Sequence, residues 1–454
     1  MASAGSRMPG GIPYIIGNEF AERFSYYGMK AILVVFMTQY LTNASGDPDY
    51  MSDPDAKYYY HLFGAANYAF PLLGAILADV FWGKYRTIIW LSLVYCLGHL
   101  FLAIDDTRIG LFFGLMFIAI GSGGIKPCVS ANVGDQFSEK NKDLLDKIFG
   151  YFYISINMGA FLSMLLTPVL LYKYGPSVAF AVPGVLMFLA TVLFWMGRKK
   201  FIRVPPVGTK RYLEALRSPE GMKAMVNLIP IYTLVAVFWS LFEQTGSSWL
   251  LQAQKMNLDV NLGFTQFKLL ASQIQSVNSL LILFFVPLFA FVVYPFLKRF
   301  TPLTGLQKIT IGVVLAALSY VICAFVETLI QAGQTPSILY QMFAFVMLTA
   351  AEVMVSVTAL EFAYTQAPNQ LKSFVMSFYL LSVSAGNLIA AFVNGFIQNP
   401  DGTPKINDVT YFLFFVGLAL VSALAIFLYS LIYKEEAYLQ NVEEVKGEEA
   451  ALGG

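Results

Sequence analysis

The chain has 454 residues, of which 57% are hydrophobic and 13% are charged, and its net charge is +1. Soluble domains carry about 25% charged residues, so this composition excludes an ordinary soluble protein and predicts a polytopic membrane protein. The balanced charge gives no indication of a nucleic-acid partner. Because Cys96, Cys128 and Cys323 lie in apolar runs, we expect reduced cysteines and neither a disulfide framework nor a metal site.

Twelve apolar segments are long enough to cross a membrane, which takes about 20 residues in a helix. Their approximate limits are 14–41, 57–80, 87–104, 109–133, 147–171, 177–197, 223–250, 266–296, 306–330, 337–362, 373–396 and 409–433. With the N-terminus placed inside, the inner loops carry twenty lysines and arginines and the outer loops carry five. This bias predicts that both termini are cytoplasmic. The remaining cations fall within segments: Arg23, Lys30, Lys126 and Lys268.

The first segment contains four ionisable side chains in the stretch EFAERFSYYGMK. Each charge at the bilayer centre costs about 2.5 to 3.5 kcal/mol on insertion scales, so these groups need partners or water. At about 100° per residue, the polar side chains fall within one arc of the helix and predict a stripe that faces the protein interior. The stripe contains Glu19, Glu22, Arg23, Tyr26 and Lys30, with Tyr27 beside it. A structural ion-pair cluster is the alternative. Because the same charges would interrupt the apolar core of a signal peptide, we expect no cleaved signal peptide.

Two histidines follow in the second and third segments. His61 precedes Tyr68 by seven residues, so the two share a helix face. Histidine, with an unperturbed pKa of about 6.5, is a natural proton carrier, but a lone histidine in a membrane is often a hydrogen-bonded core residue. His99 has no polar neighbours, and we expect it to be structural.

The fourth and fifth segments add isolated polar groups. Lys126 lies in GSGGIKPC, where the glycines permit close helix contact and Pro127 frees backbone groups beside the cation. Tyr153 and Asn157 are four residues apart and share a helix face.

The longest and most basic loop, 198–221, separates six segments from six. We therefore predict four parts, namely an N-terminal bundle (1–197), a linker (198–221), a C-terminal bundle (222–434) and a cytoplasmic tail (435–454). Two six-helix bundles around a site at the bilayer midplane is the organisation of major facilitator transporters. The stretch GAILADVFWGKYR resembles the loop between the second and third helices of that superfamily, through Gly74, Asp79, Gly83, Lys84 and Arg86. An ordinary charged turn is the alternative.

The second half supplies carboxylates and amides. Trp239 and Glu243 share a face in FWSLFEQTGSSW, Asn278 lies in IQSVNSLL, and Glu352 lies in TAAEVMVSV. Together the predicted polar face collects three cations and four carboxylates from four helices. A nearly neutral set divided between the two halves suits a zwitterionic ligand whose ammonium and carboxylate ends are held apart.

Five stretches, in order, resemble signature motifs of the proton-coupled oligopeptide transporter family, also called the PTR family. They are EFAERFSYY, GSGGIKPCVSANVGDQF, YFYISINMGAFLS, FWSLFEQTGSSW and EVMVSVTALEFAYTQAP. The similarity extends over nearly the whole chain. It implies an all-α membrane protein of the major facilitator fold, with twelve transmembrane helices in two six-helix bundles. It further implies a secondary active transporter rather than an enzyme, with no cofactor and with the proton as the coupling ion.

The resemblance also implies roles for individual residues. Proton coupling would involve Glu19, Glu22, Arg23, His61 and Glu243. Lys126 would pair with the first-helix carboxylates or with the peptide carboxylate, helped by Tyr27 and Lys30. The ammonium end of the peptide would contact Asn157, Asn278 and Glu352. The side-chain pockets would be lined by Tyr26, Tyr68 and Trp239. The gates would be formed by Lys30 with Glu243 and by Lys126 with Glu352.

Three features depart from the family pattern. Lys30 stands where many members have arginine, so the gate pair loses bidentate geometry. Many bacterial members insert two helices between the bundles, whereas only the loop 198–221 separates them here. Animal members carry a large external domain where this chain has a short connection around QAGQTPS. We therefore expect a minimal twelve-helix form in a bacterial inner membrane, working as a monomer.

The function that follows is proton-driven symport of di- and tripeptides by alternating access. One rival keeps the fold and changes the solute, since plant relatives move nitrate, glucosides or hormones. An intramembrane protease is a second rival, but the chain has neither an HExxH site nor the GxSG spacing. A passive channel or receptor is the third.

Overall fold

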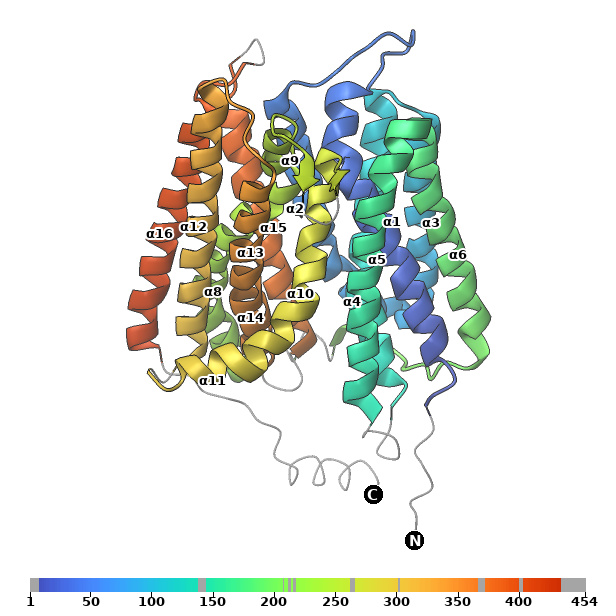
Figure 1. Cartoon of the computed structure of the whole chain (residues 1–454). Helices are drawn as coiled ribbons and strands as arrows, with labels where there is room; N and C mark the ends of the chain where they lie inside the picture. The colour runs from blue at the N-terminus through green and yellow to red at the C-terminus, as the bar shows by residue number, and fades with distance from the viewer. Residues whose placement is uncertain are drawn as a thin grey trace, which may run out of the picture.

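The computed structural model describes residues 8–137, 144–206, 208–210, 214, 218–261, 266–300, 303–365, 372–399 and 403–433. Long helices run side by side between two faces of the molecule (Figure 1). Helix α1 (Ile12–Gln39) begins and helix α16 (Asp408–Ile432) ends at the face drawn at the bottom of Figure 1, here called the lower face. The opposite face is called the upper face.

The N-terminal bundle contains six transmembrane helices. After α1 these are α2 (Asp53–Ile76), α3 (Lys84–Ile104), α4 (Arg108–Asp135), α5 (Leu145–Tyr174) and α6 (Pro176–Met196). A π-helical turn, Leu77–Trp82, extends α2 to the lower face, and a short 3-10 turn, Gly197–Lys199, follows α6.

The C-terminal bundle also has six transmembrane helices, three of which are interrupted. The first contains α8 (Pro219–Phe242), a 3-10 turn (Glu243–Gly246) and α9 (Ser248–Ala253). The second contains a 3-10 turn (Ala271–Gln275), α10 (Ser276–Leu288), a π-helical turn (Phe289–Val293) and α11 (Tyr294–Leu297). Then come α12 (Gly305–Gln331), α13 (Leu339–Glu352), a π-helical turn (Val353–Val357), α14 (Thr358–Thr365), α15 (Lys372–Phe396) and α16.

Local chemistry sets where several helices begin. The side chains of Ser52, Thr107, Thr304 and Asn407 accept hydrogen bonds from backbone N–H groups in the first turns of α2, α4, α12 and α16. These caps satisfy donors that have no partner within a helix. The sequence therefore specifies these helix starts without help from tertiary contacts.

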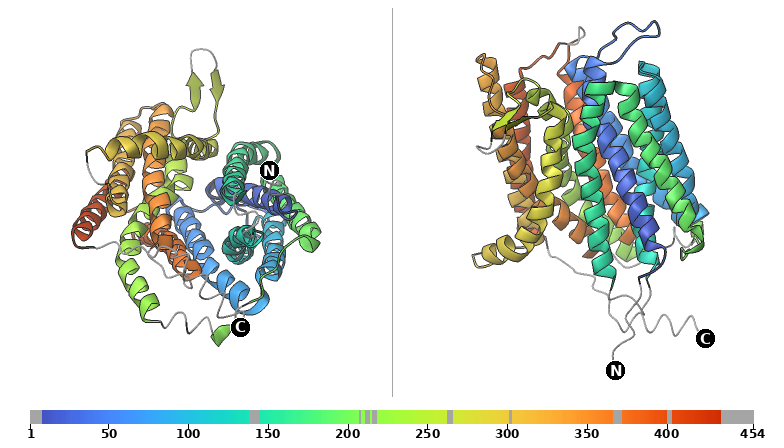
Figure 2. Two further views of the ribbon diagram at one scale, coloured as in Figure 1. Left: turned by 90° about the horizontal axis from the view of Figure 1, so that it is seen from below. Right: turned by 45° about the vertical axis from the view of Figure 1, so that its right-hand side comes forward.

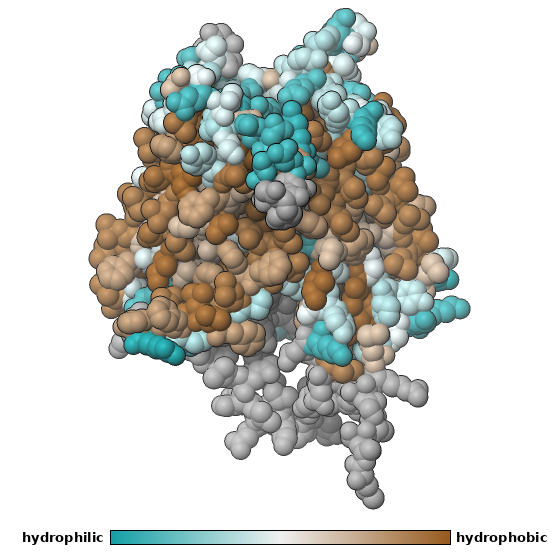
Figure 3. Space-filling model, in the orientation of Figure 1, coloured by the Kyte–Doolittle hydropathy of each residue, from teal (hydrophilic) through white to brown (hydrophobic). Residues whose placement is uncertain are grey.

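The outer surface fits a membrane. Eleven helices of the described residues are long and apolar enough to span one. Helix α1 is not among them, because its ionisable side chains lower its apolar character, yet it lies inside the N-terminal bundle. On the side of the molecule shown in Figure 3, an apolar band crosses the middle, and polar residues gather toward both faces.

Each bundle has its own hydrophobic core. The N-terminal core includes buried Tyr95, Phe180 and Phe194, and the C-terminal core includes Trp249 and Phe345. The bundles lie beside each other when viewed along the helices (Figure 2). They meet mainly where α2 packs against α15 and where α5 packs against α10. The domain limits at 197–198 and 221–222 stay predictions, and the tail 435–454 lies outside the described residues.

The predicted span 266–296 began too early. Residues Gln266–Lys268 form strand β2, which pairs antiparallel with β1 (Asp259–Asn261) at the upper face, and the span begins at Ala271. Lys268 therefore lies on a hairpin and not inside a span. Apolar length alone could not separate a short strand from the helix that follows it.

A close helix contact explains one glycine of the GAILADVFWGKYR stretch. A Cβ atom on Gly74 would lie 2.1 Å from the carbonyl oxygen of Gly124 on α4. Real Cβ atoms essentially never come this near, so a larger residue at position 74 would push α2 and α4 apart. A Cβ atom on Gly124 would instead lie 2.4 Å from the Leu91 side chain on α3. Gly74 thus sets the packing of the two helices that carry Tyr68 and Lys126.

Candidate functional site

A cavity of about 160 Å³ lies between the two bundles. The N-terminal bundle lines it with Tyr27, Lys30, Tyr60, Tyr68, Ile156, Asn157, Ala160 and Met164. The C-terminal bundle lines it with Trp239, Phe242, Glu243, Thr245, Gln275, Asn278, Ser279 and Glu352. Both lining carboxylates belong to the C-terminal bundle. The cavity is smaller than the roughly 300 to 1,000 Å³ of pockets for drug-sized ligands, so it suits a small solute.

An ion pair closes the cavity on its upper side. The Lys30 ammonium donates to Glu243 Oε2 at 2.5 Å, and both side chains are buried. Lys30 Nζ also lies 5.3 Å from the centre of the Tyr60 ring. The pair joins α1 to the 3-10 turn that interrupts the first transmembrane helix of the C-terminal bundle. The predicted partners of this gate therefore meet, through one oxygen of Glu243.

His61 makes a second contact between the bundles. Its Nδ1 lies 3.1 Å from Asn387 Oδ1, and its Nε2 lies 2.8 Å from Ser247 Oγ. The Asn387 amide nitrogen donates to the Val383 carbonyl, so its oxygen faces the ring and Nδ1 carries the proton. The side chain is fully buried. The sequence left two predictions for His61, a proton carrier or a hydrogen-bonded core residue. In the structure its hydrogen bonds connect the two bundles.

Other hydrogen bonds between described parts of the two bundles also lie toward the upper face. They run from Gln275 to Ala31, from Gln273 to Leu165, from Ser384 to Ala65 and from Gln398 to Ser52. Two glycines allow this approach, because a Cβ on Gly64 would collide with Asn387 and a Cβ on Gly246 would collide with the Tyr60 hydroxyl. The upper side is thus a tight interface between the bundles.

The carboxylates of the first helix gather around one guanidinium. Arg23 Nε lies 2.6 Å from Glu22 Oε2 and 2.9 Å from Glu19 Oε1. These are ionic contacts whose angles are unsuited to hydrogen bonds. The Ser122 hydroxyl on α4 donates to the other Glu22 oxygen at 3.2 Å. All three charged side chains are buried within the N-terminal bundle, beside the cavity and not in its lining.

Lys126 does not pair with these carboxylates. Its ammonium lies 4.4 Å from the centre of the Tyr26 ring and 4.2 Å from the centre of the Tyr68 ring. Tyr68 also lines the cavity. Within the part of the chain that the structure describes, no carboxylate lies within ion-pair distance of Lys126. Lys126 was expected to pair either with the first-helix carboxylates or with the peptide carboxylate. In this structure it forms no ion pair with the first-helix carboxylates. The cation is held by aromatic faces, which leave its hydrogen-bond donors available.

The opposite wall presents Glu352. Asn278 Nδ2 donates to Glu352 Oε2 at 2.7 Å and to Thr349 Oγ1 at 3.1 Å. Glu352 is the last residue of α13, directly before the π-helical turn Val353–Val357, and such turns are frequent at functional sites. The second predicted gate, Lys126 with Glu352, forms no ion pair among the described residues. The two charged groups therefore remain free to meet a ligand.

Comparison with known proteins gives the family. A family model described as the POT family matches residues 85–217 and 209–412. The chain belongs to the POT family.

Individual relatives agree with this membership. Solute carrier family 15 member 2 of Rattus norvegicus is 36% identical over 406 residues, which cover 78% of this chain and 54% of the relative. The chain thus spans about half the length of the curated relatives that it matches.

The matches to solved structures extend over nearly the full length of the solved chains. The crystal structure of an auto-inhibited POT family peptide transporter superimposes with a TM-score of 0.84 at 34% identity, covering 96% of this chain and 99% of that one. A proton-dependent oligopeptide (POT) family transporter gives 0.75 at 36% identity, covering 91% and 100%. These matches confirm the predicted fold class, a major facilitator fold of twelve transmembrane helices in two bundles.

Of three predicted site residues of this POT family protein, Tyr26 lies outside the cavity lining, and Asn157 and Trp239 lie within it. Tyr26 does not line the cavity, because its hydroxyl accepts from Asn67 and its ring lies beneath Lys126. The Asn157 amide donates to the carbonyl of Tyr153, one helical turn earlier, although the residue does line the cavity. Trp239 lines it too, but its indole N–H is buried and has no hydrogen-bond partner among the residues that the structure describes.

Several residues at the site of this POT family protein were missed in the sequence. The cavity also contains Tyr60, Thr245, Gln275 and Ser279, and His61 depends on Ser247 and Asn387. Asn387 carried a signal, since it is an isolated amide in the apolar run SAGNLIAAF. The small hydroxyl residues carried none, because serine and threonine also bond to their own helix backbone inside membranes.

Proposed function

We propose that this protein is a proton-driven symporter of di- and tripeptides. Two structurally similar proteins are a POT family peptide transporter and a proton-dependent oligopeptide (POT) family transporter. The observation that carries the proposal to this chain is the division of charge across the cavity. Lys126 remains available near the N-terminal wall, and Glu352 with Asn278 remains available on the C-terminal wall.

This division of charge suits a zwitterion that bridges the bundles. The peptide carboxylate would contact Lys126 and the Tyr68 side, and its ammonium would contact Glu352, Asn278 and Asn157. Binding through the two ends leaves the side chains in contact with Tyr27, Trp239 and other largely apolar walls. Broad side-chain specificity follows, because recognition depends on groups that all short peptides share.

Protonation would weaken the upper closure. A proton on Glu243 would remove its charge and release Lys30, and protonation of His61 would convert its Nε2 from acceptor to donor. In the first helix, a proton on Glu19 or Glu22 would leave the second carboxylate to hold Arg23. One proton crossing 100 mV supplies about 2.3 kcal/mol, and one pH unit supplies about 1.4 kcal/mol. Together these support accumulation of several hundred-fold.

We infer that the lower face is cytoplasmic, because the basic loops lie there. The closed upper side then separates the cavity from the outside, and peptide would leave by the lower side. The protein would work as a monomer in a bacterial inner membrane, since each chain contains both walls of the cavity.

The proposal is tested by uptake of labelled dialanine into proteoliposomes under an imposed pH gradient. Wild-type protein is expected to accumulate the peptide, Glu22→Gln to lose the dependence on the gradient, and Lys126→Ala to lose uptake. Matched controls are Lys173→Ala, an exposed lysine in the last turn of α5, and Asp259→Asn, an exposed carboxylate on β1. Both controls are expected to transport normally.

Two outcomes would contradict the proposal. Flux that is independent of protons would indicate a passive channel. Competition of dialanine uptake by nitrate would favour a transporter of a different solute on the same fold.

A further inference from the structure

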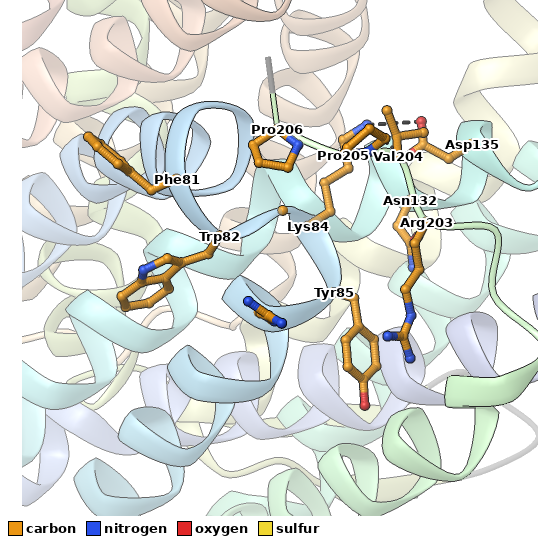
Figure 4. A pocket seen from close by; sticks show the side chains of 12 residues that line it. Phe81, Trp82, Lys84, Tyr85, Asn132, Asp135, Arg203, Val204, Pro205 and Pro206 are labelled. Atoms are coloured by element: carbon orange, nitrogen blue, oxygen red, sulfur yellow. Dashed lines mark hydrogen bonds and ion pairs between the residues drawn. The ribbon is translucent and has the colours of Figure 1, made fainter. Parts of the chain in front are cut away.

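A second cavity, of about 340 Å³, lies at the lower face, away from the central one. It is formed where the π-helical turn after α2 ends and α3 begins, and the linker residues Val204, Pro205 and Pro206 cover one side (Figure 4). Nothing in the proposed transport cycle uses it. Its lining nonetheless has a consistent chemistry, because nearly all its free polar groups are hydrogen-bond donors.

The deepest of these donors is Asn132 on α4. Asn132 is 3% exposed, lines the cavity, and its amide nitrogen has no hydrogen-bond partner among the described residues. Its oxygen is already used, since it accepts from Gln136 at 3.3 Å. A buried N–H without a partner costs about 1 to 3 kcal/mol, so an acceptor in the cavity would be favoured.

The start of α3 adds backbone donors. Gly83, with a φ of +76°, turns the chain from the π-helical turn into α3, and no side chain caps the first turn. The N–H groups of Lys84, Tyr85 and Arg86 therefore lie at the N-terminus of a 21-residue helix, without partners inside it. Such a terminus attracts negative charge.

Two arginines supply positive charge and form no ion pair with a carboxylate of the described residues. The one lining carboxylate, Asp135, is held by Lys84, whose ammonium donates to both of its oxygens at 2.9 and 2.7 Å. Arg86 is exposed and has no ion-pair partner within the described part of the chain. The Arg203 guanidinium stacks on the Tyr85 ring at 4.0 Å. The net charge of these side chains is positive, so the cavity favours an anion.

The outer side of the cavity is apolar. Phe81 and Trp82 are 58% and 43% exposed, and they lie across from Tyr85 and Arg203 (Figure 4). Exposed tryptophan beside arginine is typical of the boundary between lipid tails and headgroups. An anion that carries acyl chains would contact both sides of the cavity at once.

We propose that this cavity binds a phosphate group, supplied by the headgroup of an anionic membrane lipid. The phosphate oxygens accept from Asn132, the first turn of α3 and the guanidinium groups of Arg86 and Arg203. The acyl chains lie against Phe81 and Trp82. Free inorganic phosphate has the same acceptor chemistry, but it cannot use the apolar side.

The test is native mass spectrometry of the purified full chain in detergent, titrated separately with phosphatidylglycerol, phosphatidylcholine and inorganic phosphate. Phosphatidylglycerol is expected to bind at least about tenfold more tightly than phosphatidylcholine, whose choline is repelled by the arginines. Arg203→Gln and Asn132→Leu are each expected to weaken phosphatidylglycerol binding by about tenfold or more.

Lys199→Gln is the matched control. Lys199 is an exposed cation near the same loop that does not line the cavity, so its removal tests general attraction to charge, worth about fivefold per residue. If Asn132→Leu fails to fold, Arg203→Gln decides the test, because Arg203 is exposed on the linker.

Three results would overturn the proposal. Equal losses in Lys199→Gln and Arg203→Gln would mean diffuse attraction and no defined site. Equal affinity for the two lipids would exclude selection of an anionic headgroup, because both lipids carry the phosphate. Inorganic phosphate that binds as tightly as phosphatidylglycerol would keep the anion site but exclude a lipid as its source.

Discussion

The upper and lower ends of the surface between the bundles carry similar charges but use them differently. Toward the upper face Lys30 and Glu243 are buried and paired at 2.5 Å. Farther toward the lower face Lys126 contacts only aromatic rings and Glu352 only an amide, among the contacts of the described residues. A charge that is paired across the bundles stabilises one conformation. A charge without an ion-pair partner at the cavity, as for Glu352, or behind the lining residue Tyr68, as for Lys126, can bind a solute.

Both carboxylates of this comparison lie where a helix is interrupted. Glu243 is the first residue of a 3-10 turn, and Glu352 directly precedes a π-helical turn. Irregular turns free backbone groups and let a side chain leave the regular helical face. The interruption does not decide whether the carboxylate is paired; the distance to the opposite bundle does.

Breaking the upper pair should have the largest effect. Lys30→Ala leaves Glu243 buried without a partner, so we expect a loss of about 3 to 5 kcal/mol in the stability of the upper-closed conformation. The measurement is labelling of a cysteine introduced at Thr245, together with thermal unfolding in detergent. The double variant Lys30→Ala with Glu243→Ala removes both charges and is expected to recover much of the loss. Equal losses in the single and double variants would mean that the pair does not hold the closure.

Replacing His61 should have a smaller effect at the same end. His61→Phe leaves Asn387 and Ser247 without their partner, and we expect a loss of about 1 to 2 kcal/mol in the free energy of unfolding. His99→Phe is the matched control, because His99 is also buried but neither of its ring nitrogens has a hydrogen-bond partner in the described part of the chain. Thermal unfolding of both variants gives the comparison. A larger loss for His99→Phe would show that ring packing, and not the contact between bundles, matters here.

Lys126→Gln should separate stability from transport at the lower end. It removes two cation–π contacts, worth about 0.5 to 1 kcal/mol each, and no ion pair. We therefore expect the free energy of unfolding to fall by less than about 2 kcal/mol while dialanine uptake falls more than about tenfold, because a charge-assisted contact to the ligand is lost. Parallel assays of unfolding and uptake check this. A stability loss as large as that of Lys30→Ala would place Lys126 with the structural charges.

The smallest effect is expected at the upper loops. Arg108 Nε donates to Asp49 at 2.6 Å, and this hydrogen bond lowers the pKa of Asp49 below its ordinary value of 3.8. A carboxyl with a lowered pKa contributes stability that is present above its unfolded pKa and is lost as the pH falls through the folded pKa. Asp49→Asn should therefore change the unfolding midpoint very little near neutral pH. Wild-type protein should lose slight stability as the pH falls below about 4, and the variant should not show this loss. Unfolding scans over this range measure it, and an unchanged acid profile would contradict the role of the pair.

Much of the fold could be predicted because its causes are local. The apolar length of a span and the cost of a buried charge depend on neighbouring residues, so the spans and the stripe on the first helix were visible in the sequence. The hairpin at Gln266–Lys268 was not, because its short strands are too weakly patterned to compete with the adjacent apolar run. The interruptions at Glu243 and Val353 carried no local signal either.

With Lys268 as the exception, the ionisable groups that the sequence places within apolar runs lie within the transmembrane helices of the structure, and charges there must be enclosed by protein. Only the tertiary structure decided their partners. Lys30 and Glu243 are 213 residues apart and meet because the bundles are closed on the upper side, whereas Lys126 meets tyrosine rings. The unpartnered Asn132 amide likewise became visible only once α4 was packed beside the start of α3. The physical reason is that the energy of a charge or a hydrogen bond depends on distances between helices, which follow from the packing of both bundles.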